Sequence, residues 1–215
     1  IAGCNRFRIV VRGNGCHGAM PELGVDPINI AAHIYISLQE IIAREISATQ
    51  SAVLTIGKFV GGEAANIIPG EVVMEGTIRS LNKEIGEFIF NRVNDIVIST
   101  AKMFRGEAEL IELSSVPPLT NDTELSKEVT SYLKDLLGEK SVVLFEGGGM
   151  GSEDFASYSY KVPSVYLMLG AGTKQENPLY GEAMHNEKVV FNEDILVTGA
   201  AMHTYSAIMW LKNNK

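Results

Sequence analysis

Over its first half the chain alternates between two spacings of apolar residues, one typical of strands and one typical of helices. Four stretches are rich in β-branched residues or alternate apolar with polar side chains, which is typical of strands. They are residues 7–12, 51–59, 71–80 and 107–114. Between them, apolar residues recur at helical spacing over residues 27–47 and over residues 85–100, which predicts two amphipathic helices. The order β-α-β-β-α-β predicts a ferredoxin-like α+β domain over residues 5–115, with four antiparallel strands and both helices on one face.

Local signals indicate where these elements begin and how they pair. Asp26-Pro27 combines an N-cap with a proline at the first helical position, and Asn82 can cap the second helix. The turn at residues 66–70 predicts that the strand after it pairs with the strand before it as a hairpin. The face of the sheet without helices is expected to be free to pack against a neighbour.

Val116-Pro117-Pro118 indicates a linker, because two prolines cannot continue a strand ladder. The order of predicted elements changes after it. The predicted elements are a helix from Asp122 to Gly138, apolar strands at residues 142–145 and 164–169, a short helix near residues 155–160 and a last helix ending near Asn213. Alternating strands and helices are typical of an α/β sheet, but two strands are too few to form one. Residues 116–215 are therefore predicted to be the C-terminal part of a larger domain whose first half lies upstream.

Composition narrows the function classes. A net charge of −8 over 215 residues argues against a nucleic-acid surface, and no apolar run approaches the length of about 20 residues that a membrane span needs. Two cysteines form no disulfide framework, which favours free thiols and a cytoplasmic setting. The chain begins with Ile1, so its natural N-terminus is not seen and a signal peptide cannot be judged.

His17 lies in the glycine-rich stretch Gly13–Pro21, at the end of a predicted strand. Glycines permit tight turns and close approach of another group, and a histidine there can donate or accept a proton near neutral pH. The plainer alternative is a solvated histidine in a turn. Asn66 and Arg79 form a second candidate pair, since a hairpin could bring an amide and a guanidinium together on a carboxylate. Their plainer interpretation is a turn residue and a surface arginine.

The second half offers two further candidates. The loop Gly147–Gly151 with Ser152 precedes a helix and could bind an anion, although plain capping is an equal alternative. His185 lies in a long loop before the last helix, where a metal ligand or an acid/base group competes with a solvated histidine. No cluster of His, Cys, Asp and Glu has the spacing of a closed metal site.

Five motifs and the His185 loop, taken together, resemble a known family. The motifs are Phe7-Arg-Ile-Val-Val-Arg-Gly-Asn-Gly-Cys-His17-Gly-Ala-Met-Pro21, Gly24-Val-Asp-Pro-Ile28, Gly61-Gly-Glu-Ala-Ala-Asn66-Ile-Ile-Pro69, Gly76-Thr-Ile-Arg79-Ser80 and Met150-Gly-Ser-Glu-Asp-Phe155. In this order and spacing the chain resembles the aminoacylase/carboxypeptidase superfamily of dinuclear zinc hydrolases, and most closely its amidohydrolase branch of hippurate and auxin-conjugate hydrolases. Cys16 departs from the branch, which usually has glycine at that position.

The resemblance implies a lid or dimerisation domain at residues 5–115, followed by the C-terminal part of a catalytic domain. It implies that His17 stabilises the developing oxyanion in the partner subunit's site. It further implies that Asn66, Arg79, Gly151 and Ser152 contact substrate and that His185 is a metal ligand. Two divalent ions, zinc or alternatively manganese or cobalt, would activate water.

The family's remaining metal ligands and general base would lie upstream of Ile1, so this chain alone is expected to be inactive. The expected reaction of the parent enzyme is hydrolysis of an N-acyl-L-amino acid or a related amide, with the protein acting as a homodimer. A dipeptidase or carboxypeptidase of the same family is one alternative. A non-catalytic module that dimerises or binds amino acids is another, since fold alone does not give function.

Overall fold

The computed structural model describes residues 1–145 and 147–214. The chain forms two compact units. The first comprises Ile1–Thr120 together with Gly147–Ser157, and the second comprises Asn121–Glu146 together with Tyr158–Lys215. Each unit is described by itself below.

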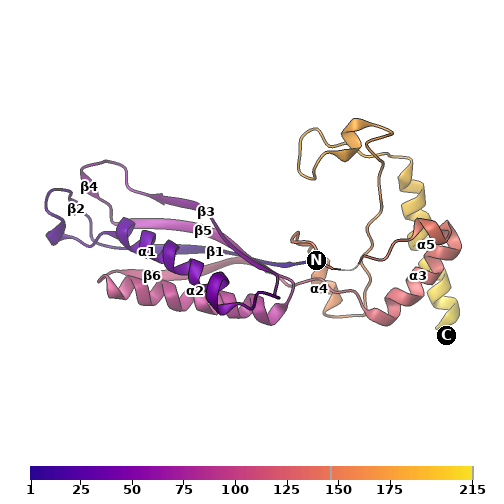
Figure 1. Cartoon of the computed structure of the whole chain (residues 1–215), viewed down its shortest axis with the longest axis horizontal. Coiled ribbons are helices and arrows are strands. Elements are labelled where there is room, and N and C mark those ends of the chain that lie inside the picture. The colour runs from indigo at the N-terminus through magenta and orange to yellow at the C-terminus, as the bar shows by residue number, and fades with distance from the viewer. Residues whose placement is uncertain (146, 215) are drawn as a thin grey trace. The chain divides into compact units, whose positions relative to one another are not determined.

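The first unit is built on a four-stranded antiparallel sheet. Its strands are β1 (Gly3–Arg12), β3 (Ala52–Gly61), β5 (Glu71–Ser80) and β6 (Glu107–Val116), in the spatial order β3-β5-β1-β6. Helices α1 (Pro27–Glu40) and α2 (Lys83–Met103) lie along one face of the sheet (Figure 1). The ferredoxin-like prediction is confirmed, including the antiparallel pairing of β3 with β5.

Both helices begin where the sequence predicts. The Asp26 carboxylate accepts from the backbone N–H of Ile28 at 2.9 Å, and the Asn82 side chain accepts from that of Ile85 at 2.9 Å. Each cap satisfies a backbone donor that the first helical turn leaves unpaired. The first helix is shorter than predicted, because α1 gives way to a π-helical turn at Ile41–Glu45.

The core lies between the sheet and the two helices. Alternate residues of β1 and β5 meet the apolar faces of α1 and α2, and 15 residues form one buried cluster. Its largest fully buried members are Phe7, Ile9, Val11, Ile30, Ile34, Leu38, Ile41, Val72, Met74, Ile78, Ile89 and Val93. Burial of these apolar side chains away from water is the main favourable contribution to the stability of this unit.

The opposite face of the sheet carries charges. Arg8 and Lys58 both contact the Glu75 carboxylate, at 2.9 and 3.2 Å, and Arg12 pairs with Glu109. These residues alternate with core residues along their strands, so they point away from the helices. This face of the sheet therefore carries ion pairs between neighbouring strands beside exposed apolar residues such as Val60 and Ile111.

A small two-stranded ribbon lies at one end of the sheet. It pairs β2 (Cys16–His17) with β4 (Ile67–Ile68), so the two segments that the sequence predicts as turns are hydrogen-bonded to each other. Two glycines permit this approach. A Cβ on Gly15 would lie 3.0 Å from the Ile68 oxygen, and one on Gly18 would lie 3.0 Å from the Asn66 oxygen.

The second unit is mainly helical. Helices α3 (Thr123–Leu137) and α5 (Ile195–Asn213) pack through a small cluster of Val129, Leu133 and Met202. Asp122 caps α3 as predicted, and Gly138, with φ of 88°, ends it. The remaining short helices in the described residues of both units are the 3₁₀ helices η1 (Pro21–Leu23), η3 (Glu139–Ser141) and η4 (Pro178–Gly181) and the α-helix α4 (Ala156–Ser159).

The predicted strands at residues 142–145 and 164–169 are wrong, because neither segment is assigned as a strand. A strand needs a hydrogen-bonded neighbour, and no described segment pairs with either of them. Their apolar side chains are also poorly covered: Phe145 is 91% exposed and Met168 is 85% exposed. The apolar runs predicted strands, but an apolar run is a strand only where a neighbouring segment pairs with it. Among the helices described, none is both long and apolar enough to cross a bilayer.

Candidate functional site

His17 is presented on the two-stranded ribbon with its imidazole exposed to solvent. Its Nδ1 accepts a hydrogen bond from the backbone N–H of Ala19 at 3.1 Å. In a neutral imidazole, one ring nitrogen accepts and the other carries the proton. In the neutral ring, the contact with Ala19 therefore favours the tautomer whose proton is on Nε2, which leaves Nε2–H as a hydrogen-bond donor.

Asn66 lies beside His17 because the ribbon brings their segments together. The backbone N–H of Gly18 donates to the backbone carbonyl oxygen of Asn66 at 2.8 Å. His17 lies opposite Ile67 in the register of β2 and β4. Both residues are solvent-exposed. Asn66 lies in the turn just before β4, and an exposed amide there and an imidazole N–H on β2 can each donate to a carbonyl oxygen or an oxyanion.

Arg79 lies at the opposite end of the sheet. It is opposite Cys4 of β1 and Val53 of β3, near the last residue of β5. Its Nη1 donates to the Met150 oxygen at 2.8 Å, which connects the guanidinium to the glycine-rich loop. The guanidinium has five N–H donors in total, so this bond leaves capacity for a planar anion such as a carboxylate.

Gly151 and Ser152 directly follow this contact and are both exposed. Upstream of them, the Gly149 oxygen accepts from the backbone N–H of Ala2 at 2.9 Å. A Cβ on Gly148 would lie 2.6 Å from the side chain of Leu81. These contacts place the loop against the end of the sheet where Arg79 lies, so Arg79, Gly151 and Ser152 form one local group.

The expected convergence of Asn66 with Arg79 is not found within one protomer. In register, Glu71 lies opposite Arg12 at the ribbon end of β5, and Arg79 is eight positions further along the strand. At about 3.4 Å per residue in an antiparallel strand, this run is about 27 Å long, and the ribbon lies beyond it (Figure 1). The sequence could not predict this, because the position of Asn66 depends on its pairing with β2.

His185 lies in the loop between η4 and α5 and is exposed. Its φ of 65° is in the left-handed region, which non-glycine residues seldom adopt and which is enriched at functional sites. A zinc site in a protein takes three or four protein ligands. No group of three or more His, Cys, Asp or Glu side chains gathers within residues 1–145 and 147–214. Within the described residues, His185 is therefore not part of such a group.

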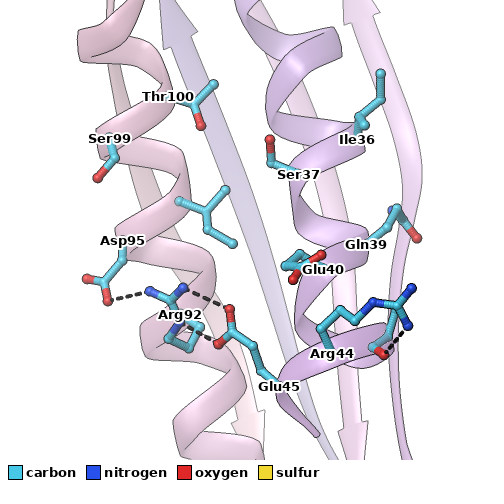
Figure 2. Close-up of a pocket in the computed structure, with 12 residues that line it drawn as sticks. Ile36, Ser37, Gln39, Glu40, Arg44, Glu45, Arg92, Asp95, Ser99 and Thr100 are labelled. Atoms are coloured by element: carbon cyan, nitrogen blue, oxygen red, sulfur yellow. Dashed lines mark hydrogen bonds and ion pairs between the residues drawn. The ribbon is translucent and has the colours of Figure 1, made fainter.

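A groove of about 640 Å³ runs between α1, the π-helical turn and α2. Figure 2 shows Arg92 of α2 between two carboxylates, with Nε and Nη2 bonded to Glu45 at 2.6 and 2.8 Å and Nη1 bonded to Asp95 at 3.2 Å. The hydrogen bonds from Arg92 hold the pKa of Glu45 below its usual value. None of the predicted site residues lines the groove, and its Arg92 cluster connects the end of α1 to α2.

With this geometry in place, comparison with known proteins is informative. Residues 2–103 match the family described as "Peptidase dimerisation domain", of the M20 type. This part of the chain is an M20 peptidase dimerisation domain. The match covers the sheet as far as β5 and both helices, and it includes the ribbon that carries His17 and Asn66. The resemblance noted from the motifs is thereby confirmed.

Relatives of the dimerisation domain and its C-terminal extension are considerably longer than this chain. An IAA-amino acid hydrolase of Arabidopsis thaliana is 32% identical over 216 residues, which cover 99% of this chain and 48% of the relative. The chain spans about half the length of the curated relatives it matches.

Two solved structures have the same fold. A candidate aminohydrolase from methicillin-resistant Staphylococcus aureus superposes with a TM-score of 0.82 at 28% identity, over 97% of this chain and 52% of that one. A Bacillus subtilis protein described as a dinuclear metal-binding peptidase of the M20 family gives a TM-score of 0.74 at 24% identity, over 98% and 51%. At 24% identity, the similarity to the Bacillus subtilis structure shows a common fold and nothing more.

Sequence reasoning missed one exposed residue of the ribbon. Ile67 lies directly opposite His17 and is 55% exposed, although its side chain is large and apolar. The local signal was present, since two isoleucines in succession before Pro69 favour an extended segment. What the sequence did not reveal is the partner strand, because β2 lies about 50 residues upstream.

Proposed function

We propose that the dimerisation domain belongs to a metal-dependent amidohydrolase that cleaves an N-acyl-L-amino acid, or a related amide, into a carboxylate and an amine. The observation that carries this proposal is the division of the candidate residues into two groups at opposite ends of one sheet. His17 and Asn66 lie at the ribbon end, and Arg79, Gly151 and Ser152 lie at the other end. The relative named an IAA-amino acid hydrolase supports an amino-acid-containing amide as substrate.

The two groups cannot hold one substrate within a single protomer. In an N-acyl amino acid, three bonds separate the scissile carbonyl carbon from the carboxylate carbon, a path of about 4.3 Å at most. His17 and Arg79 are separated by about 27 Å of strand or more. We therefore propose a homodimer in which His17 and Asn66 of one protomer meet Arg79 of the partner subunit. A domain of the dimerisation family is suited to this arrangement.

Within such a site each residue has a distinct role. The Nε2–H of His17 donates to the carbonyl oxygen and to the oxyanion that develops from it, and the Asn66 amide orients the same oxygen. Arg79 binds the substrate carboxylate with the N–H groups that Met150 leaves available, and the backbone around Gly151 and Ser152 forms the adjacent wall. The differential stabilisation of the oxyanion is what would accelerate the reaction.

His185 is proposed as one ligand of a centre of two divalent ions, zinc or alternatively manganese or cobalt, completed by residues outside the described chain. When bound, such ions supply an activated water and polarise the carbonyl group. The exposed imidazole and the left-handed backbone of His185 fit a ligand held in a fixed direction.

The proposal is tested by measuring bound metal and hydrolysis of a panel of N-acyl amino acids. The assay compares this 215-residue chain with a form of the protein as long as its relatives. We expect about two metal ions per chain and turnover from the longer form alone. Turnover by the 215-residue chain would show that the metal centre is wrongly assigned. Dimerisation without turnover by either form would instead favour a non-catalytic binding module.

A further inference from the structure

The ribbon that presents His17 also presents a large apolar side chain to the same place. In an antiparallel pair, residues directly opposite each other project from the same face, with Cβ atoms about 4.5–5.5 Å apart. His17 and Ile67 are such a pair, whereas Cys16 and Ile68 project from the other face. The side chains of His17 and Ile67 therefore start close together on one face of the ribbon.

The exposure of Ile67 has no explanation in the packing of its own domain. Its side chain is 55% exposed and does not belong to the main core cluster, while its neighbour Ile68 is partly covered. Exposed apolar residues are common singly, so exposure alone carries no weight. The pairing of the strands is the observation that matters, because it places Ile67 opposite His17, the proposed oxyanion donor. The two strands of the ribbon can approach each other because residues 15 and 18 are glycines.

The substrate's own geometry decides which part of it Ile67 meets. The scissile carbonyl carbon has two substituents besides oxygen, the amine side and the acyl side. In the proposed function, on which this inference rests, the amine side leads to the carboxylate bound by Arg79 of the partner subunit. The acyl group is then the substituent left on the side of His17.

We propose that Ile67 is a specificity-determining residue that contacts the acyl group of the substrate and selects apolar acyl chains over short or polar ones. Burial of each acyl methylene against it stabilises the bound state by the ordinary hydrophobic effect. A hydrophobic contact of this kind discriminates moderately between chain lengths.

The test uses Ile67→Thr and Val60→Thr in the active dimeric enzyme. Val60 is the matched control, because it is also β-branched, 56% exposed and placed near the ribbon end of β3, while it pairs with Val73 and not with His17. Threonine keeps the strand preference in both variants. The measurement is kcat/KM for the N-acetyl, N-butanoyl and N-hexanoyl derivatives of one amino acid.

In the unmodified enzyme and in Val60→Thr, we expect kcat/KM to rise with acyl length. In Ile67→Thr, the hexanoyl-to-acetyl ratio of kcat/KM should fall by about three- to tenfold. An unchanged ratio in Ile67→Thr, with the enzyme active, would overturn the role of Ile67 and leave the proposed function standing. No hydrolysis of any derivative by the unmodified enzyme would overturn both.

Discussion

The contact between Gly18 and Asn66 is the point where a single methyl group should damage the site without unfolding the domain. A Cβ at Gly18 would lie 3.0 Å from the Asn66 oxygen and 3.1 Å from its carbonyl carbon. Since favourable contacts between carbon atoms begin near about 3.5 Å, the Gly18→Ala variant must displace Asn66 by about 0.4 Å. A misplacement of about 1 Å can cost about 100-fold in rate, so we expect kcat to fall about five- to tenfold.

Gly70→Ala is the matched control, because a Cβ at Gly70 meets nothing within 4 Å although Gly70 lies only two positions after the same ribbon. Both variants reduce the flexibility of the unfolded chain equally, an effect of about 0.4–1 kcal/mol in favour of the fold. Gly70→Ala should therefore be slightly more stable and fully active, and Gly18→Ala should lose activity and show no gain in stability. Steady-state kinetics and thermal melts check this. Equal kcat in the two variants would refute the claim that this backbone contact positions the site.

Two further predictions concern stability. In Arg92→Met, the stability of the fold should depend less on acidic pH. Arg92 lowers the pKa of Glu45, so the stabilisation from their interaction is fully present above the ordinary glutamate pKa of about 4.3. It is lost as the pH falls through the lower pKa of the folded state. Melting temperatures between neutral and acidic pH check this, and an unchanged acid profile would contradict it. Ile89→Ala, at a fully buried position of α2, should cost about 2–5 kcal/mol, whereas Ile98→Ala, 48% exposed on the same helix, should cost about 0.5 kcal/mol or less. Urea denaturation distinguishes the two, and equal losses would contradict the assigned core.

The fold of the first unit was predictable because its signals are local. Alternation identified the strands, and Asp26 and Asn82 marked the starts of the helices, as their hydrogen bonds confirm. The π-helical turn at Ile41–Glu45 was not predictable, because apolar residues continue at helical spacing through it. Its end is fixed by the contact between Glu45 and Arg92, which are 47 positions apart.

The arrangement of the candidate site was less predictable than its members. His17, Asn66 and Arg79 were identified from motifs, but their grouping depends on which segments pair across long stretches of chain. Only the register of β2 with β4 reveals that Asn66 belongs with His17, and only the bond from Arg79 to the Met150 oxygen reveals that Arg79 belongs with the glycine loop. The failed strands at residues 142–145 and 164–169 have the same cause, since a strand is defined by its neighbour.

The most direct test of a site shared between protomers is subunit complementation in the active enzyme. His17→Ala and Arg79→Ala proteins are prepared separately, mixed in equal amounts, dissociated and reassembled. In a two-fold symmetric dimer with shared sites, each mixed dimer has one site that carries both substitutions and one that carries neither. About half of the dimers are mixed on random assembly, so the account predicts recovery of about a quarter of wild-type activity from two inactive parents. If the mixture stays as inactive as its parents while mixed dimers are demonstrably present, His17 and Arg79 do not act across the interface, and the account is contradicted.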